Sequence, residues 1–128
     1  MRTAMRGIIL ALALVSIAMS AVAQVLFKAG MSAAPVRAAL AAGGAPRVIR
    51  AVALNPGVLG GLALYGLGTV LWLAVLSRAE LSQAYPFVGL SFVLTAVFGV
   101  VLFHDALSVS RIAGIAAIVV GVYLVGQS

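Results

Sequence analysis

Apolar residues dominate four long stretches of the chain, and most charged residues lie between them. The uncharged stretches cover residues 7–27, 56–77, 81–103 and 112–127. A helix needs about 20 apolar residues to cross roughly 30 Å of hydrocarbon. The stretches are continuous and lack the two-residue alternation of barrel strands, so they predict membrane-spanning helices.

The pattern therefore predicts an all-α membrane protein, with one domain over residues 1–128 that forms a bundle of four transmembrane helices. We expect the helices over about residues 7–31, 56–77, 81–103 and 107–126. The last apolar stretch is short, so its helix has to include the residues from 107 onward. Arg111 would then reach the membrane interface, and Ser108 or Ser110 could cap the helix.

The first connection, residues 32–55, differs from the short later ones. Its second part carries Arg47 and Arg50 among apolar residues and could lie along the membrane surface, with both guanidinium groups facing lipid phosphates. Gly43 and Gly44 equally suit a disordered basic loop. The sequence leaves both interpretations open.

Composition excludes most soluble functions. The chain is 65% hydrophobic and 8% charged, whereas soluble domains carry about 25% charged residues. With no cysteine, one histidine and two acidic residues, it offers no metal site. It also lacks a P-loop, a dinucleotide fingerprint and the HExxH and GxSxG motifs, so we expect neither an enzyme nor a bound cofactor.

The net charge of +6 comes from basic residues between the apolar stretches. In that position they are expected to contact anionic lipid headgroups rather than nucleic acid. Arginine and lysine in short loops set membrane orientation. Here they are balanced between the two sides, which permits either orientation or both: Arg2, Arg6 and Arg78 lie on one side, and Arg37, Arg47, Arg50 and Arg111 on the other.

The N-terminus has some features of a signal peptide, because residues 1–6 are basic and residues 21–23 read Ala-Val-Ala. The apolar stretch continues past this point to Phe27. We therefore expect the first helix to remain uncleaved.

Polar residues inside membrane helices are energetically costly and often mark pathways or helix contacts. In the first helix Ser16, Ser20, Gln24 and Lys28 recur every four residues, and each step rotates only about 40° beyond a full turn. They share one face, which could line a pathway. Alternatively, the serines and Gln24 join helices by hydrogen bonds while Lys28 reaches the membrane interface. We favour this alternative for Ser16, and a substrate contact for Gln24 and Lys28.

The third helix begins with Gln83-Ala-Tyr85-Pro86, where the proline removes a backbone donor and can bend the helix. Tyr85 could face a cavity or anchor at the interface, and Pro86 could equally be a first-turn residue. Ser91 and Thr95 lie one turn apart on one face. Trp72, well inside the second helix, could form a cavity wall.

Small residues allow helices to approach closely. Gly114, Ala117 and Gly121 fall on nearly one face of the fourth helix and predict an oligomer interface. Gly57 and Gly61 form a GxxxG pair that is a weaker signal in a glycine-rich chain. One bundle of four helices leaves little room for a solute path, so a dimer is expected.

Several segments together resemble the four-helix, EamA-like members of the drug/metabolite transporter superfamily. The resemblance covers the first helix and most of the C-terminal half, and its motifs are Ser20-Ala-Val-Ala-Gln24-Val-Leu-Phe-Lys28, residues 81–92, Phe103-His104-Asp105 and residues 111–121. Small multidrug resistance exporters in this superfamily carry a glutamate at the position of Ser20. Without that carboxylate, proton-coupled drug antiport has no proton carrier here.

The branch of proposed aminoarabinose-phosphoundecaprenol flippase subunits fits better, since it has serine, glutamine and lysine at these places and an Ala-Tyr-Pro start to the third helix. The resemblance implies a flippase-like subunit for a polyprenyl-phosphate-linked sugar in the bacterial inner membrane, acting as a homodimer or with a related small subunit. It implies that Lys28 attracts the lipid phosphate. The other predicted substrate-binding residues are Ser20, Gln24, Trp72, Tyr85, Pro86, Ser91 and Thr95.

Two alternatives stay open from the sequence. The chain could export a small cation or metabolite through a site other than the missing glutamate. It could also be a scaffold that transports nothing and stabilises a larger membrane assembly.

Overall fold

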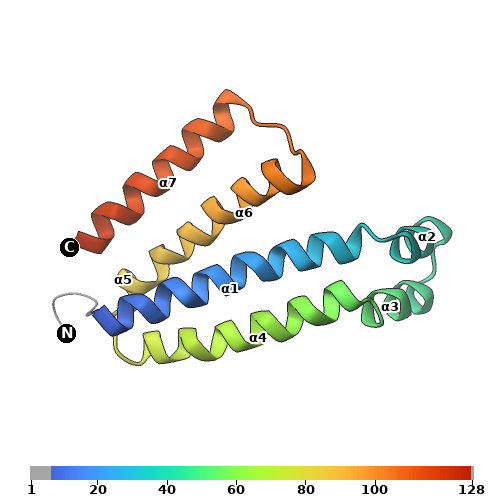
Figure 1. The fold of residues 1–128 in the computed structure, drawn as a ribbon, viewed down its shortest axis with the longest axis horizontal. Helices are drawn as coiled ribbons and strands as arrows, with labels where there is room; N and C mark the ends of the chain where they lie inside the picture. The colour runs from blue at the N-terminus through green and yellow to red at the C-terminus, as the bar shows by residue number, and fades with distance from the viewer. Residues whose placement is uncertain (1–6, 128) are drawn as a thin grey trace.

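The computed structural model describes residues 7–127 and is helical over most of that range (Figure 1). In chain order its elements are α1 (Gly7–Met31), α2 (Ala34–Ala42), α3 (Ala45–Ala53), α4 (Pro56–Leu76), α5 (Leu81–Ala84), the 3₁₀ helix η1 (Tyr85–Val88), α6 (Gly89–Phe103) and α7 (Val109–Gln127). Arg2 and Arg6, part of the predicted orientation signal, lie outside the described residues.

Four helical spans are long and apolar enough to cross a membrane: α1, α4, the segment Leu81–Phe103 and α7. Their outer faces are apolar, with Leu67 61% exposed and Val70 63% exposed. Such apolar side chains match hydrocarbon, and the backbone groups between the two ends of a helix are hydrogen-bonded within it. The prediction of four apolar membrane helices is confirmed.

The long helices are arranged as a row rather than around a shared centre. Figure 1 shows α4 beside α1, α6 on the other side of α1, and α7 beyond α6, in agreement with the contacts between these elements. Two apolar clusters hold the row together. One contains Ile9, Ala13 and Val75, the other contains Ile17 and Phe87, and Trp72 packs against both.

The contact between α1 and α4 is the most extensive in the fold, and glycine makes it possible. A Cβ atom on Gly57 would lie 2.9 Å from the Cα atom of Gly30 and 3.0 Å from the carbonyl oxygen of Leu26. A Cβ atom on Gly61 would lie 3.1 Å from the carbonyl oxygen of Ala23. The GxxxG pair that seemed a weak signal in the sequence is therefore the packing surface between these helices.

Asn55 fixes the relative position of α1 and α4 at one end. Its Oδ1 accepts a hydrogen bond from the Val58 amide at 3.0 Å, which caps α4, and its Nδ2 donates to the Gly30 carbonyl at 3.1 Å. Pro56 follows in the first turn, where its missing N–H group leaves no helical bond unmade. One buried side chain thus starts α4 and ties it to the end of α1.

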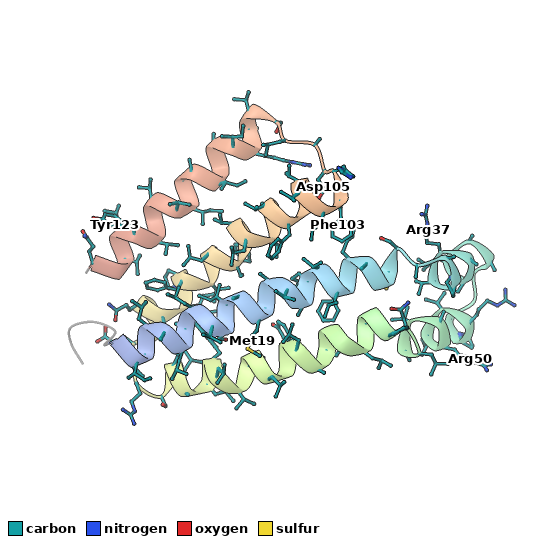
Figure 2. All side chains as sticks on the ribbon, viewed as in Figure 1. Met19, Arg37, Arg50, Phe103, Asp105 and Tyr123 are labelled. Atoms are coloured by element: carbon teal, nitrogen blue, oxygen red, sulfur yellow. The ribbon has the colours of Figure 1, made fainter. Side chains whose placement is uncertain are left out.

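The first connection forms two short helices, so the disordered-loop interpretation is wrong. Gly43 and Gly44, at φ 82° and 92°, make the turn between α2 and α3 in conformations that suit glycine. Each helix has a proline in its first turn. Arg37 and Arg50 project from this hairpin (Figure 2).

The third span is interrupted at the predicted proline. Pro86 cannot donate a backbone hydrogen bond, and the chain forms the 3₁₀ helix η1 between α5 and α6. The last helix begins at Val109 rather than 107, because the Ser108 hydroxyl accepts a hydrogen bond from the Arg111 amide at 3.1 Å. This confirms Ser108 as a capping residue.

We predict that Gly57→Ala lowers the free energy of unfolding by about 1–3 kcal/mol, because the new methyl group would meet backbone atoms of α1 that cannot rotate away. Unfolding of the purified protein in mixed micelles, titrated with a denaturing detergent, measures the effect. The matched control is Gly66→Ala on the same helix, where an added Cβ meets no atom within 4 Å. Equal loss of stability in both variants would contradict the assigned packing.

Candidate functional site

Two cavities follow one another along the side of α1 that meets α6, which we call the α1–α6 seam; α4 and η1 also line the first of them. We call the first the hydroxyl cavity; its volume is about 250 Å³. The second, the lysine cavity, has about 260 Å³. Ser20 of the hydroxyl cavity and Gln24 of the lysine cavity are one helical turn apart on α1, and Ser91 and Thr95 are related in the same way on α6. The two spaces therefore follow one another along the same pair of helices.

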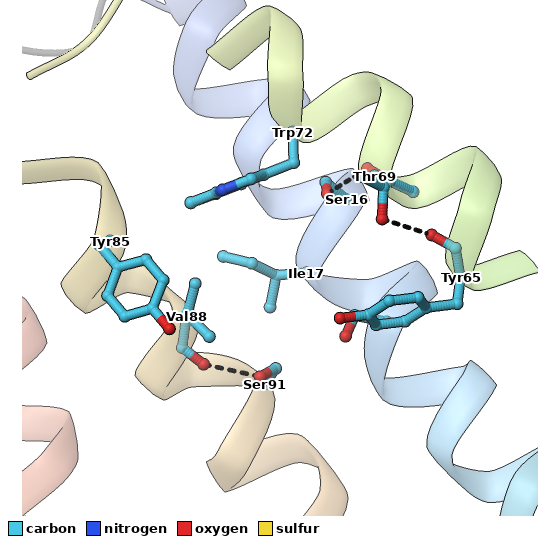
Figure 3. A pocket seen from close by; sticks show the side chains of 10 residues that line it. Ser16, Ile17, Tyr65, Thr69, Trp72, Tyr85, Val88 and Ser91 are labelled. Carbon is cyan, nitrogen blue, oxygen red and sulfur yellow. Dashed lines mark hydrogen bonds between the residues drawn. The ribbon is translucent and has the colours of Figure 1, made fainter. Parts of the chain in front are cut away.

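The hydroxyl cavity is enclosed by α1, α4 and the segment around η1. Figure 3 shows Trp72 extending from α4 toward the segment that carries Tyr85, with Ile17 of α1 in the centre of the view. Tyr65 lies on α4 at the other side of the same space. None of the ten residues lining this cavity is charged. The polar side-chain groups of its lining are hydroxyl groups and the indole N–H of Trp72.

Three of the six hydroxyl groups that line this cavity already donate a hydrogen bond. Ser16 Oγ donates to the Gly68 carbonyl at 2.7 Å and joins α1 to α4, as expected for that residue. Ser91 Oγ donates to the Val88 carbonyl at 2.6 Å, and Thr69 Oγ1 donates to the Tyr65 carbonyl at 2.9 Å (Figure 3). A hydroxyl oxygen that donates can still accept. These groups are therefore placed to accept hydrogen bonds from a polyhydroxyl ligand.

The lysine cavity lies nearer the α2–α3 end of the molecule. Its lining includes Gln24 and Lys28 from α1, Thr95 from α6, and Asp105 from the turn after α6. Thr95 Oγ1 donates to the Phe92 carbonyl at 3.0 Å. Within residues 7–127, the side chains of Gln24 and Lys28 make no hydrogen bond or ion pair. Their polar groups are available for a ligand.

The structure thus divides the predicted substrate-binding residues between two spaces. Seven of the eight line a cavity, with Ser20, Trp72, Tyr85 and Ser91 in the first and Gln24, Lys28 and Thr95 in the second. Pro86 lines neither and shapes the backbone of η1 instead.

Three polar lining residues are not among the predicted site residues. Tyr65 and Thr69 line the hydroxyl cavity together with Trp72. Their spacing of four and three residues places them on one helix face, and this signal could have identified them. Asp105 lines the lysine cavity, but only the fold of the turn brings it there.

The predicted oligomer residues on α7 face away from the rest of the chain. Gly114, Ala117 and Gly121 are exposed, and an added Cβ atom on either glycine would meet nothing within 4 Å. The small-residue face is therefore open in the single chain.

The fold and cavities define the class of protein: a small multi-pass membrane protein with a polar seam between two of its helices. Part of the chain is similar to curated bacterial proteins, and three of these relatives are each named "Probable 4-amino-4-deoxy-L-arabinose-phosphoundecaprenol flippase subunit ArnE". They come from Pseudomonas syringae pv. syringae (41% identical over 66 residues), Pseudomonas savastanoi pv. phaseolicola (40% over 81) and Aeromonas hydrophila (36% over 72).

These alignments cover 52%, 56% and 56% of this chain and 61%, 71% and 63% of the respective relatives. The chain thus spans about three fifths of the length of the first relative. No family model matches the sequence, and no solved structure matches it. At 40% identity across 71% of the P. savastanoi protein, the chain belongs to the family of these ArnE flippase subunits.

Proposed function

We propose that this chain is a subunit of a flippase that moves a polyprenyl-phosphate-linked sugar across the bacterial inner membrane. The observation that carries the proposal is the pair of cavities along the α1–α6 seam, one rich in hydroxyl groups and one containing Lys28. The names of the relatives, which describe a phosphoundecaprenol-linked amino sugar, support it independently.

The length of the seam suits a headgroup that must pass through hydrocarbon. From Ser16 to Lys28 the α1 helix rises about 18 Å, which is more than half of the roughly 30 Å hydrocarbon thickness. Moving a polar group through lipid costs several kcal/mol of free energy for each hydrogen bond that it cannot make there. Hydroxyl and amide groups spaced one turn apart along α1 and α6 would replace water at successive steps.

Each cavity suits a different part of the ligand. In the lysine cavity the ammonium group of Lys28 has no partner within the described chain and can pair with a phosphate. In the hydroxyl cavity Ser20, Ser91 and Tyr85 can exchange hydrogen bonds with a sugar, while the Trp72 ring packs against its apolar face. The hydroxyl cavity contains no carboxylate, so it offers no ion pair to a cationic ligand.

The proposal also includes a second membrane subunit that packs against α7. The row of helices leaves the Gly114, Ala117 and Gly121 face uncovered. Close helix contact at small residues is a common basis of association in membranes. A second copy of this chain, or a related small subunit, would pack there.

We predict that Lys28→Ala slows transbilayer movement of a labelled polyprenyl-phosphate-linked sugar at least about tenfold in proteoliposomes, because a charge-assisted contact to phosphate is lost. Lys28→Arg keeps the charge and is expected to retain most of the rate. The control is Arg78→Ala, which removes a positive charge from the short connection between α4 and α5, outside both cavities. If the Lys28→Ala variant moves the lipid as fast as wild type, the proposed role of Lys28 is refuted. Binding of soluble cations by the protein would favour an exporter instead.

We also predict that Gly121→Leu weakens self-association through α7. An Ala117→Cys background, which introduces the chain's sole cysteine, should form a disulfide-linked dimer on oxidation. Adding Gly121→Leu should reduce that product strongly because the larger side chain separates the helices. Gly66→Leu, at an equally open glycine on α4, should leave the product unchanged. Equal yields with and without Gly121→Leu would place the interface elsewhere.

A further inference from the structure

The lysine cavity contains two opposite charges that do not neutralise each other. Lys28 and Asp105 are the charged residues among its eight lining residues. In the described part of the chain no nitrogen–oxygen pair within 4.0 Å joins them. The space between an unpaired ammonium group and an unpaired carboxylate can take a ligand that carries both charges itself.

The turn after α6 directs Asp105 into this position. His104 adopts a left-handed conformation, with φ 57° and ψ 36°, and ends α6. The Asp105 amide then donates to the Gly99 carbonyl at 3.0 Å. This turn brings the chain back against α6, and Figure 2 shows Asp105 beside the end of that helix, near Phe103.

Gly99 provides the space that the carboxylate occupies. A Cβ atom at this position would lie 2.5 Å from Asp105 Oδ2 and 3.4 Å from its Cγ. An alanine would therefore displace the carboxylate while leaving its charge unchanged. Arg111, the basic residue of α7, donates its guanidinium N–H to the Ala106 carbonyl, and neither Arg111 nor His104 lines the cavity.

We propose that Asp105 binds a protonated amine on the sugar, so that the lysine cavity selects a headgroup carrying both a phosphate and an ammonium group. This role rests on the proposed function, because the ligand must first bring its phosphate to Lys28. The carboxylate contributes selectivity for the amine and does not take part in attracting the phosphate.

A purely structural role for Asp105 makes a different prediction. A carboxylate that only stabilised the turn or the nearby start of α7 would affect all ligands alike. A carboxylate that binds the amine affects only ligands that have one. The deciding readout is therefore the ratio of two affinities and not the affinity for one lipid.

The experiment measures binding of two lipids to the full chain in nanodiscs: a polyprenyl-phosphate-linked amino sugar, and the same lipid with its amine acetylated and uncharged. Asp105→Asn should weaken binding of the amino lipid about tenfold or more and leave the acetylated lipid nearly unchanged. Gly99→Ala, which keeps the acid but displaces it, should reduce the same preference. Lys28→Ala should weaken binding of both lipids.

The outcomes separate the two claims. If wild type binds both lipids equally, or if Asp105→Asn weakens both to the same extent, the role of Asp105 is overturned and the proposed function stands. If wild type binds neither lipid, the proposed function fails and this inference fails with it. A loss of amine preference in both Asp105→Asn and Gly99→Ala, with binding of the acetylated lipid intact, supports the assignment.

Discussion

The close approach of α1 and α4 is the constraint on which the rest of the structure depends. Gly57 and Gly61 bring the α4 backbone against α1, and Asn55 bonds α1 where α4 begins. Between apolar helices in lipid the hydrophobic effect gives little drive for association, so tight packing and interhelical hydrogen bonds have to supply it. Ser16 adds such a bond near the middle of both helices. These contacts fix the rotation of α1 about its own axis.

That rotation decides where the polar face of α1 points. With one side of α1 held against α4, Ser20, Gln24 and Lys28 come to line the cavities shared with α6. The 3₁₀ helix at Pro86 places Tyr85 at the first cavity, and the turn at His104 places Asp105 at the second. The polar seam therefore results from one tightly packed helix pair and two interruptions of regular helix. Because the helices form a row, α7 stays at its edge with its small residues uncovered.

Much of the fold could be predicted from residue patterns, because the hydrocarbon thickness sets the length of an apolar helix. The four-residue spacing from Ser16 to Lys28 also predicted a shared polar face, and the structure distributes that face over two cavities. Local sequence could not decide the state of residues 32–55, since glycine pairs suit both a helical turn and a flexible loop. Nor could it place Asp105 in the cavity that Lys28 lines, because that placement depends on the backbone of one turn and on the missing side chain of Gly99. The importance of Gly57 and Gly61 for helix packing could not be predicted for a similar reason, because a GxxxG pair does not indicate which helix packs against it.

Protection of an introduced cysteine tests most directly whether an anionic lipid headgroup enters the seam. The chain has no native cysteine, so Thr95→Cys in the lysine cavity can be labelled alone with a small thiol reagent. We expect a polyprenyl phosphate in the same vesicles to slow labelling several-fold. The uncharged polyprenol should not slow it, and labelling of Ser77→Cys, exposed at the far end of α4, should be unaffected by either lipid. If Thr95→Cys is labelled at one rate with polyprenyl phosphate, with polyprenol and without either lipid, the headgroup does not enter the seam.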